Sequence, residues 1–215
     1  MNSLTSYDLI IWDFNGTILD DVWHGISAVN TLLSRRNLPT IDTLEHYYSV
    51  FGFPIEDYYR RLGLLDVDDY PTLAAEWIKE YRAKEDTLPA RKDAVSLLSR
   101  IEKAGKKQSI LSATETEMLK KQLSYLGLTS YFSEVLGRRD YYAADKSNIA
   151  VAFRQANPTL KVLMIGDTDH DFKAAQMAGF DCALVAGGHQ SLAYLQSICK
   201  DTFADFAALE RELFA

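Results

Sequence analysis

Asp13 is the residue whose surroundings point most directly to chemistry. It follows the apolar run of residues 9–12 and precedes a Gly16-Thr17 turn, after which a helix begins. A carboxylate in this place is expected to lie at the carboxyl end of a buried strand, where α/β sheets hold their ligands. An aspartate there can act as a nucleophile and form a covalent aspartyl intermediate.

Ser112 and Lys146 lie at two later transitions between elements. Ser112 ends the apolar segment 108–112 and precedes a helix expected to begin near Glu115. A hydroxyl and free backbone N–H groups at a helix start make a natural phosphate cradle. Lys146 lies at the start of another helix, where its ammonium group can hold a phosphoryl group and keep Asp13 ionised.

Asp167 and Asp171 belong to a fourth polar segment, which follows the strongest expected strand, residues 161–165. Their carboxylates are hard oxygen ligands of the kind that Mg²⁺ prefers, together with substrate phosphate. Between them, we expect Asp169 to be a solvated loop residue. His170 either contacts the substrate or is a loop histidine without a role, and both interpretations stay open.

The elements that must position these residues fall into two blocks. From about residue 20 to about residue 86, apolar residues recur at helical spacing, which predicts a wholly helical segment. From residue 88 onward, short apolar strands alternate with amphipathic helices. Such alternation predicts an α/β domain with a parallel sheet and helices on both faces. The helical block is therefore expected to be an insertion after the first strand.

Composition narrows the class of protein further. The 215 residues, 47% of them hydrophobic, suffice for one substantial core and a small accessory domain. A net charge of −7 without a basic stripe argues against a nucleic-acid partner. The two cysteines lack metal-ligand spacing and are expected to be reduced. We find no signal peptide and no membrane-spanning stretch, and so expect a cytoplasmic protein with no membrane partner and no obligate protein partner.

The four polar segments, taken in order, resemble the motifs of the haloacid dehalogenase superfamily. Asp13 corresponds to the first motif, usually Asp-x-Asp-Gly-Thr, and Ser112 to the second. Lys146 corresponds to the third, and Asp167 and Asp171 to the fourth. The resemblance covers nearly the whole chain, and the fourth motif is most similar to that of the phosphoglycolate-phosphatase group.

The resemblance implies a Rossmann-like three-layer core with a parallel sheet, formed by residues 1–17 and 87–215. Residues 18–86 would form a helical C1-type cap domain. The implied activity is that of a phosphatase for a small phosphorylated metabolite, in which Asp13 attacks phosphorus and Mg²⁺ bridges it to the phosphate. The implied site residues are the metal ligands Asp13, Asn15 (through its carbonyl), Asp167 and Asp171, the substrate-binding residues Ser112, Ala113 and Lys146, and the catalytic residues Asp13, Asn15 and Lys146.

Asn15 departs from the pattern, because family phosphatases have a second acidic residue there, which protonates the leaving oxygen and later activates water. An amide forms hydrogen bonds but does not transfer a proton in this way, and general acid–base catalysis contributes ~10²–10⁴ in rate. Three outcomes stay open: turnover of activated phosphates that need no acid, a base borrowed from the cap or from His170, or binding of phosphorylated ligands without useful hydrolysis.

Other functions of the superfamily can be weighed against the residues present. A phosphonatase needs a cap lysine for a Schiff base, and residues 18–78 contain no lysine. A dehalogenase needs no Mg²⁺, whereas Asp167 and Asp171 indicate a retained metal site. A catalytically weak or silent protein that binds a phosphorylated metabolite is the alternative to an enzyme.

Overall fold

The computed structural model describes residues 1–138 and 146–215, and the chain divides into two compact units. The core unit comprises residues 1–20 and 89–215, and the helical unit comprises residues 21–88.

Both boundaries fall slightly later in the chain than the sequence suggested. The outgoing and returning segments pair with each other inside the core unit: Leu19 forms an isolated bridge with Ala90, and the Arg91 N–H donates to the Ile18 carbonyl at 2.7 Å. These bonds explain why residues 18–20 and 89–91 belong to the core unit.

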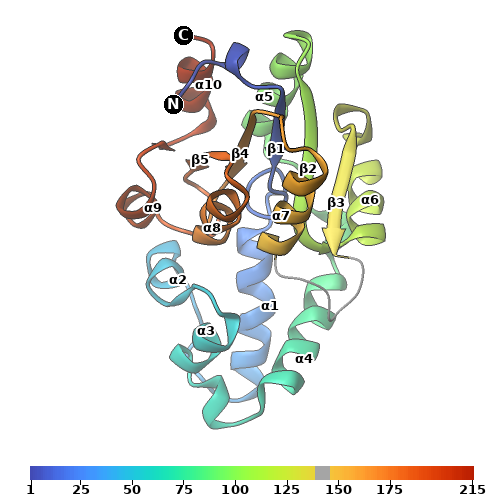
Figure 1. Ribbon diagram of the computed structural model, residues 1–215. Coiled ribbons are helices and arrows are strands. Elements are labelled where there is room, and N and C mark those ends of the chain that lie inside the picture. The colour runs from blue at the N-terminus through green and yellow to red at the C-terminus, as the bar shows by residue number, and fades with distance from the viewer. Residues whose placement is uncertain (139–145) are drawn as a thin grey trace. The chain divides into compact units, whose positions relative to one another are not determined.

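A six-stranded sheet forms the centre of the core unit, with the strand order β3-β2-β1-β4-β5-β6 and every pairing parallel (Figure 1). This confirms the expected α/β class with a Rossmann-like parallel sheet. The strands are β1 (Leu9–Trp12), β2 (Lys107–Glu115), β3 (Glu134–Arg138), β4 (Val162–Gly166), β5 (Asp181–Val185) and β6 (Thr202–Phe203).

Burial explains which strands the sequence reveals. Every residue of β1 and β4 is buried, because parallel strands at the centre of a sheet are covered on both faces and consist of continuous apolar runs. The edge strands β3 and β6 are mainly half-buried, and β6 has two residues. Without a continuous apolar run they give little signal, and the sequence did not predict them.

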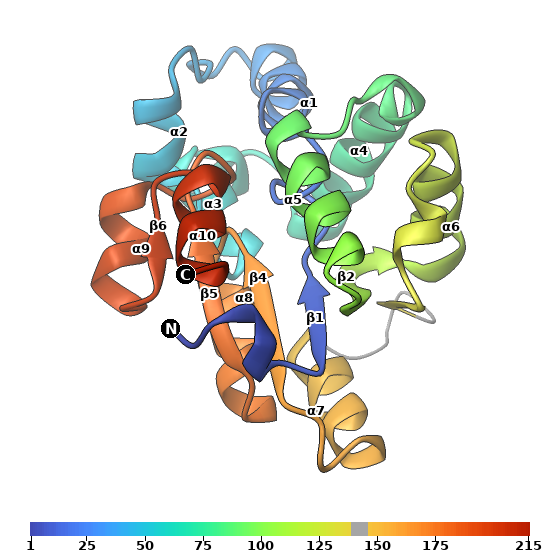
Figure 2. The same cartoon turned by 90° about the horizontal axis from the view of Figure 1, so that it is seen from above.

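Helices cover both faces of this sheet. Helices α7 and α8 pack on one face, and α5 and α10 lie on the other (Figure 2). The helices of the core unit are α5 (Lys92–Lys103), α6 (Thr116–Tyr125), α7 (Lys146–Ala156), α8 (Asp169–Ala178), α9 (Leu192–Ile198) and α10 (Phe206–Leu213), with the 3-10 turns η1 (Leu4–Ser6) and η4 (Thr129–Tyr131).

The helical unit has its own apolar core, rich in tyrosine and leucine, and its described residues contain no β-strand. Its elements are α1 (Val22–Arg35), α2 (Leu44–Val50), α3 (Ile55–Arg61), η2 (Leu64–Asp66), α4 (Tyr70–Arg82) and η3 (Glu85–Thr87). Across the described parts of both units, no helix combines the length and apolar character that crossing a membrane requires.

The strand order fixes where a ligand can bind in the core unit. Strand β1 is followed in sequence by strands on one side of the sheet, whereas β4 leads to strands on the other side. The strand order therefore reverses between β1 and β4. The loop after β1 leads to one side of the sheet, and the loop after β4 leads to the other. In open α/β sheets, ligands bind in the crevice at this point.

Candidate active site

Three carboxylates meet where the strand order reverses. Asp13 follows β1, Asp167 follows β4, and Asp171 is the third residue of α8. One carboxylate oxygen from each lies within 4.8 Å of the other two. The residues are only 6%, 0% and 1% exposed, respectively. The fold thus brings Asp13 together, out of water, with Asp167 and Asp171, which lie far from it in the sequence.

Lys146 supplies a cation to this group. It is the first residue of α7 and is 5% exposed, and its Nζ donates to Oδ1 of Asp13 and to Oδ1 of Asp171. Burial alone lowers the pKa of Lys146, but the two carboxylates outweigh burial and raise this pKa above its ordinary value. The lysine is therefore held in its charged form between the two acids.

The charges in the site do not balance, because three carboxylates share one ammonium group. Burial raises the pKa of Asp13 well above its ordinary range, Lys146 opposes this rise, and the carboxylates of Asp171 and Asp167 add to it. Burial also raises the pKa of Asp167. A further positive charge at this place would stabilise the ionised carboxylates.

Two hydrogen bonds from loops hold the Asp167 carboxylate. Thr17 Oγ1 donates to Oδ1 at 2.7 Å, and the His189 backbone N–H donates to Oδ2 at 2.6 Å. Gly16 and Gly188 lie against the same carboxylate so closely that a Cβ on either residue would overlap it. Gly16 also has a φ of 75°, in the left-handed region that favours glycine.

Asp171 has a structural task besides its place in the site. Its Oδ2 accepts from the Thr168 N–H at 2.9 Å, the Thr168 hydroxyl at 2.7 Å and the Asp167 N–H at 3.1 Å. These bonds cap the N-terminus of α8, where a carboxylate is favourable. Its Oδ1, in contrast, faces Lys146.

The segment around Ser112 differs from the expected phosphate cradle. Strand β2 continues to Glu115, with an irregular register between Leu111 and Glu115. The Glu115 carboxylate accepts the N–H groups of Glu117 and Met118, so it already caps the start of α6. Two of the helix amides that could have held a phosphate, those of Glu117 and Met118, are therefore occupied.

The hydrogen-bonding groups near Ser112 that could still bind a phosphate lie in the irregular part of β2. Ser112 is buried, and its Oγ accepts from the Thr114 N–H at 3.1 Å, which leaves the hydroxyl proton to donate. Ala113 is exposed. Asn15 reaches the same segment, because the Thr114 hydroxyl donates to its Oδ1 at 2.9 Å.

Sequence reasoning assigned no role to three residues that shape the site. Thr17 and His189 hold Asp167, and the Arg91 guanidinium joins the loops after β1 and β5 by donating to the Gly16 carbonyl at 3.0 Å and the Ala186 carbonyl at 3.4 Å. The two consecutive glycines directly before His189, Gly187 and Gly188, were the available signal for the His189 loop. Nothing near Arg91 in the sequence indicated its contacts.

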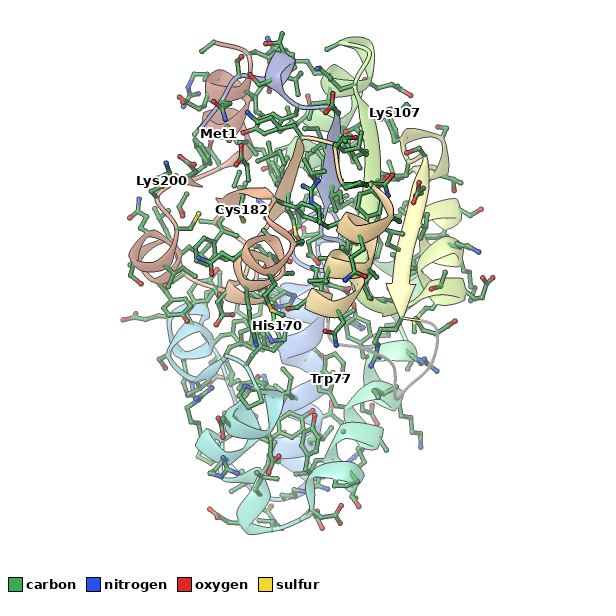
Figure 3. The ribbon with its side chains drawn as sticks, viewed as in Figure 1. Met1, Trp77, Lys107, His170, Cys182 and Lys200 are labelled. Atoms are coloured by element: carbon green, nitrogen blue, oxygen red, sulfur yellow. The ribbon has the colours of Figure 1, made fainter. Side chains whose placement is uncertain are left out.

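Asp169 and His170 lie at the beginning of α8, near the carboxyl edge of the sheet. Lys107, labelled at the amino end of β2 in Figure 3, marks the opposite edge, and His170 is labelled in the same view. Asp169 is not the solvated loop residue that we expected, because its carboxylate accepts from Gln190 Nε2 at 2.8 Å and Tyr194 Oη at 3.1 Å.

Known proteins are similar to this chain in sequence and in fold. The model of the family "Haloacid dehalogenase-like hydrolase" matches residues 10–185. The probable phosphatase IndB of Dickeya dadantii is 27% identical over 212 residues, covering 92% of this chain and 90% of that protein. A phosphoglycolate phosphatase of Caulobacter vibrioides is 25% identical over 198 residues, covering 84% and 79%. The structure of protein tyrosine kinase A of Mycobacterium tuberculosis aligns with a TM-score of 0.80 at 18% identity, covering 98% and 99%, and shares the fold.

Proposed function

Because the chain belongs to the haloacid dehalogenase-like hydrolase family, we propose that it is a Mg²⁺-dependent phosphatase for a small phosphorylated metabolite. The observation that carries the proposal is the buried group of Asp13, Asp167 and Asp171 around Lys146. Relatives named as phosphatases support the same reaction class. A cytoplasmic location stays a prediction.

The donor set fits Mg²⁺. Three buried carboxylates with one ammonium group leave negative charge uncompensated, and hard oxygen ligands are those that this ion takes. We assign Asp13, Asp167 and the Asn15 carbonyl as ligands, with Asp171 as a further one. When bound, the metal would neutralise charge on the phosphoryl group as the carboxylate approaches.

Each side chain of the site has a separate role in the proposed reaction. Asp13 attacks phosphorus, and the bond from phosphorus to the leaving oxygen breaks, which gives an aspartyl phosphate. Lys146 favours the ionised form of Asp13 and offers its ammonium group to a phosphoryl oxygen. The Ser112 hydroxyl, with the Ala113 N–H beside it, donates to another phosphoryl oxygen. Water then releases phosphate and restores the carboxylate.

We also propose that the helical unit, residues 21–88, is the cap of this enzyme and sets its choice of substrate. It is inserted after the first strand, where the family places a C1-type cap. The segments near residues 18–20 and 83–88 are proposed as its hinges. Closure of such a cap would exclude water from the reaction.

Removal of the metal gives a direct test. We expect EDTA to reduce turnover of an aryl phosphate to background and added Mg²⁺ to restore it. Asp167→Asn should weaken Mg²⁺ affinity by ~10–100-fold, because a neutral amide replaces a buried charged ligand. Affinity can be measured without activity, from the rise in Tm during a Mg²⁺ titration.

Asp169→Asn is the matched control, because the amide oxygen can still accept from Gln190 Nε2 and the amide NH2 group can donate to the Tyr194 hydroxyl. It should keep Mg²⁺ affinity close to that of the wild type. Activity that survives EDTA, or full Mg²⁺ affinity in Asp167→Asn, would contradict the assignment. Binding of phosphorylated metabolites without any release of phosphate would instead support the alternative of a silent binding protein.

A further inference from the structure

The contact between Asn15 and Thr114 defines how the unusual amide is held. Thr114 Oγ1 donates to Asn15 Oδ1 at 2.9 Å, although the two residues are 99 positions apart in the sequence. Both are half-buried. Since Oδ1 is the only acceptor atom of an asparagine side chain, this bond turns the amide so that its other end is the Nδ2 donor group.

Thr114 also connects this amide to the segment proposed to bind phosphate. Its backbone N–H donates to Ser112 Oγ at 3.1 Å, within the irregular part of β2. The side chain and the backbone of one residue thus engage Asn15 and Ser112 together. Thr114 is in this way a positioning residue for Asn15, next to the proposed phosphoryl site.

An oriented amide donor favours a particular kind of leaving group. It can stabilise a leaving oxygen that departs as an anion, but it does not protonate one. A carboxylate leaves as a stable anion, since the pKa of a carboxylic acid is about 4, whereas that of a phenol is about 10. An alkoxide is far more basic and needs a proton from an acid in the site.

We infer that this site acts on phosphate compounds whose leaving oxygen departs as a stable anion, acyl phosphates above all, with the Asn15 amide held by Thr114 as a hydrogen-bond donor to that oxygen. The inference rests on the proposed phosphatase function and specifies its substrate class.

The reaction balances without an acid at residue 15. Asp13 forms a bond to phosphorus, the bond from phosphorus to the acyl oxygen breaks, and the carboxylate leaves with the electron pair. Water then attacks phosphorus, the aspartyl–phosphorus bond breaks, and its electron pair returns to Asp13. The products are the carboxylate, hydrogen phosphate and one proton, which passes to solvent.

A leaving-group series tests this inference on the full chain with Mg²⁺. The substrates are acetyl phosphate, 4-nitrophenyl phosphate, phenyl phosphate and glycerol phosphate, and the quantity measured is kcat/KM. For the wild type we expect kcat/KM to fall steeply as the leaving-group pKa rises. Asn15→Asp should raise kcat/KM for glycerol phosphate by ~10²–10⁴-fold and lower it for acetyl phosphate, because the amide donor to the acyl oxygen is lost, so that the slope becomes shallow.

Comparing slopes between the two proteins separates enzyme from substrate effects, because the intrinsic reactivity of each phosphate is common to both. Thr114→Val should lower acetyl phosphate turnover by about tenfold while the slope stays steep, since the amide loses its orienting bond. Thr114→Ser keeps the hydroxyl and should restore the rate. Unlike Asn15→Asp, neither Thr114 variant introduces an additional carboxylate into the buried site.

The outcomes distinguish failure of this inference from failure of the proposed function. If the wild type hydrolyses glycerol phosphate as efficiently as acetyl phosphate, or Asn15→Asp leaves alkyl phosphate turnover unchanged, the inference is wrong while the phosphatase function stands. If none of the four substrates is hydrolysed with Mg²⁺, the proposed function fails. As a readout besides turnover, intact mass should show more phosphorylated enzyme for the wild type than for Asn15→Asp, whose new carboxylate can activate water.

Discussion

Replacing Asp13 by asparagine is expected to abolish phosphatase turnover, with a loss in kcat of about 10³-fold or more. The variant removes the attacking oxygen while keeping the size of the side chain, and loss of a covalent nucleophile leaves only binding and electrostatic contributions. The fold should remain, because the buried carboxylate that is lost has a pKa raised by burial, and Lys146 still pairs with Asp171. Steady-state kinetics with acetyl phosphate and thermal unfolding measure the two effects.

Asp169→Asn again serves as the control for Asp13→Asn, since it makes the same chemical change at the first residue of α8, outside the group of three carboxylates. It should keep kcat within a few-fold of the wild type. Turnover by Asp13→Asn at a rate near that of the wild type would show that another group attacks phosphorus.

Replacing Lys146 by methionine is expected to impair both stability and activity. Removing one member of a buried ion pair costs ~3–5 kcal/mol, because the partner charges stay buried without compensation. Asp13 would also lose the group that opposes the rise of its pKa, so more of it would be protonated and non-nucleophilic at neutral pH. We expect a reduced free energy of unfolding in urea without Mg²⁺ and a kcat lower by ~10²-fold or more, which corresponds to about 2.7 kcal/mol of barrier.

Lys173→Met provides the comparison, because Lys173 is exposed on α8. Its stability and kcat should stay close to those of the wild type. Were Lys146→Met to retain both its stability and its kcat, the lysine would not be the partner of Asp13 that the site requires. Mg²⁺ should recover part of the lost stability by compensating the same carboxylates.

The sequence located the acidic residues that the structure brings together because each follows a strand with a strong signal. β1 and β4 are fully buried apolar runs, and their ends mark Asp13 and Asp167. The parallel sheet then needs only its strand order to place these residues side by side. Local pattern and fold class were sufficient for this part of the site.

The other residues of the site are held by contacts between distant segments, which no local sequence pattern predicts. The His189 N–H reaches Asp167 from a loop 22 residues further on. Arg91 joins Gly16, 75 residues before it in the sequence, to Ala186, 95 residues after it. At α6, the Glu115 carboxylate accepts two of the helix N–H groups that a phosphate could have used, a contact that the sequence did not predict. Whether an acidic side chain turns back to its own helix is decided by local geometry, which the spacing of residues leaves undetermined.

Detection of a phosphoryl group on Asp13 is the most direct test of the central claim, that this carboxylate is the nucleophile of a phosphatase. Wild-type protein is mixed with Mg²⁺ and acetyl phosphate, quenched in acid, and examined by intact mass and by peptide mapping after reduction of the acyl phosphate with borohydride. We predict a phosphorylated species whose modified residue is Asp13 and which is absent from Asp13→Asn. Release of phosphate without any such species in the wild type, or an adduct that persists in Asp13→Asn, would contradict the account.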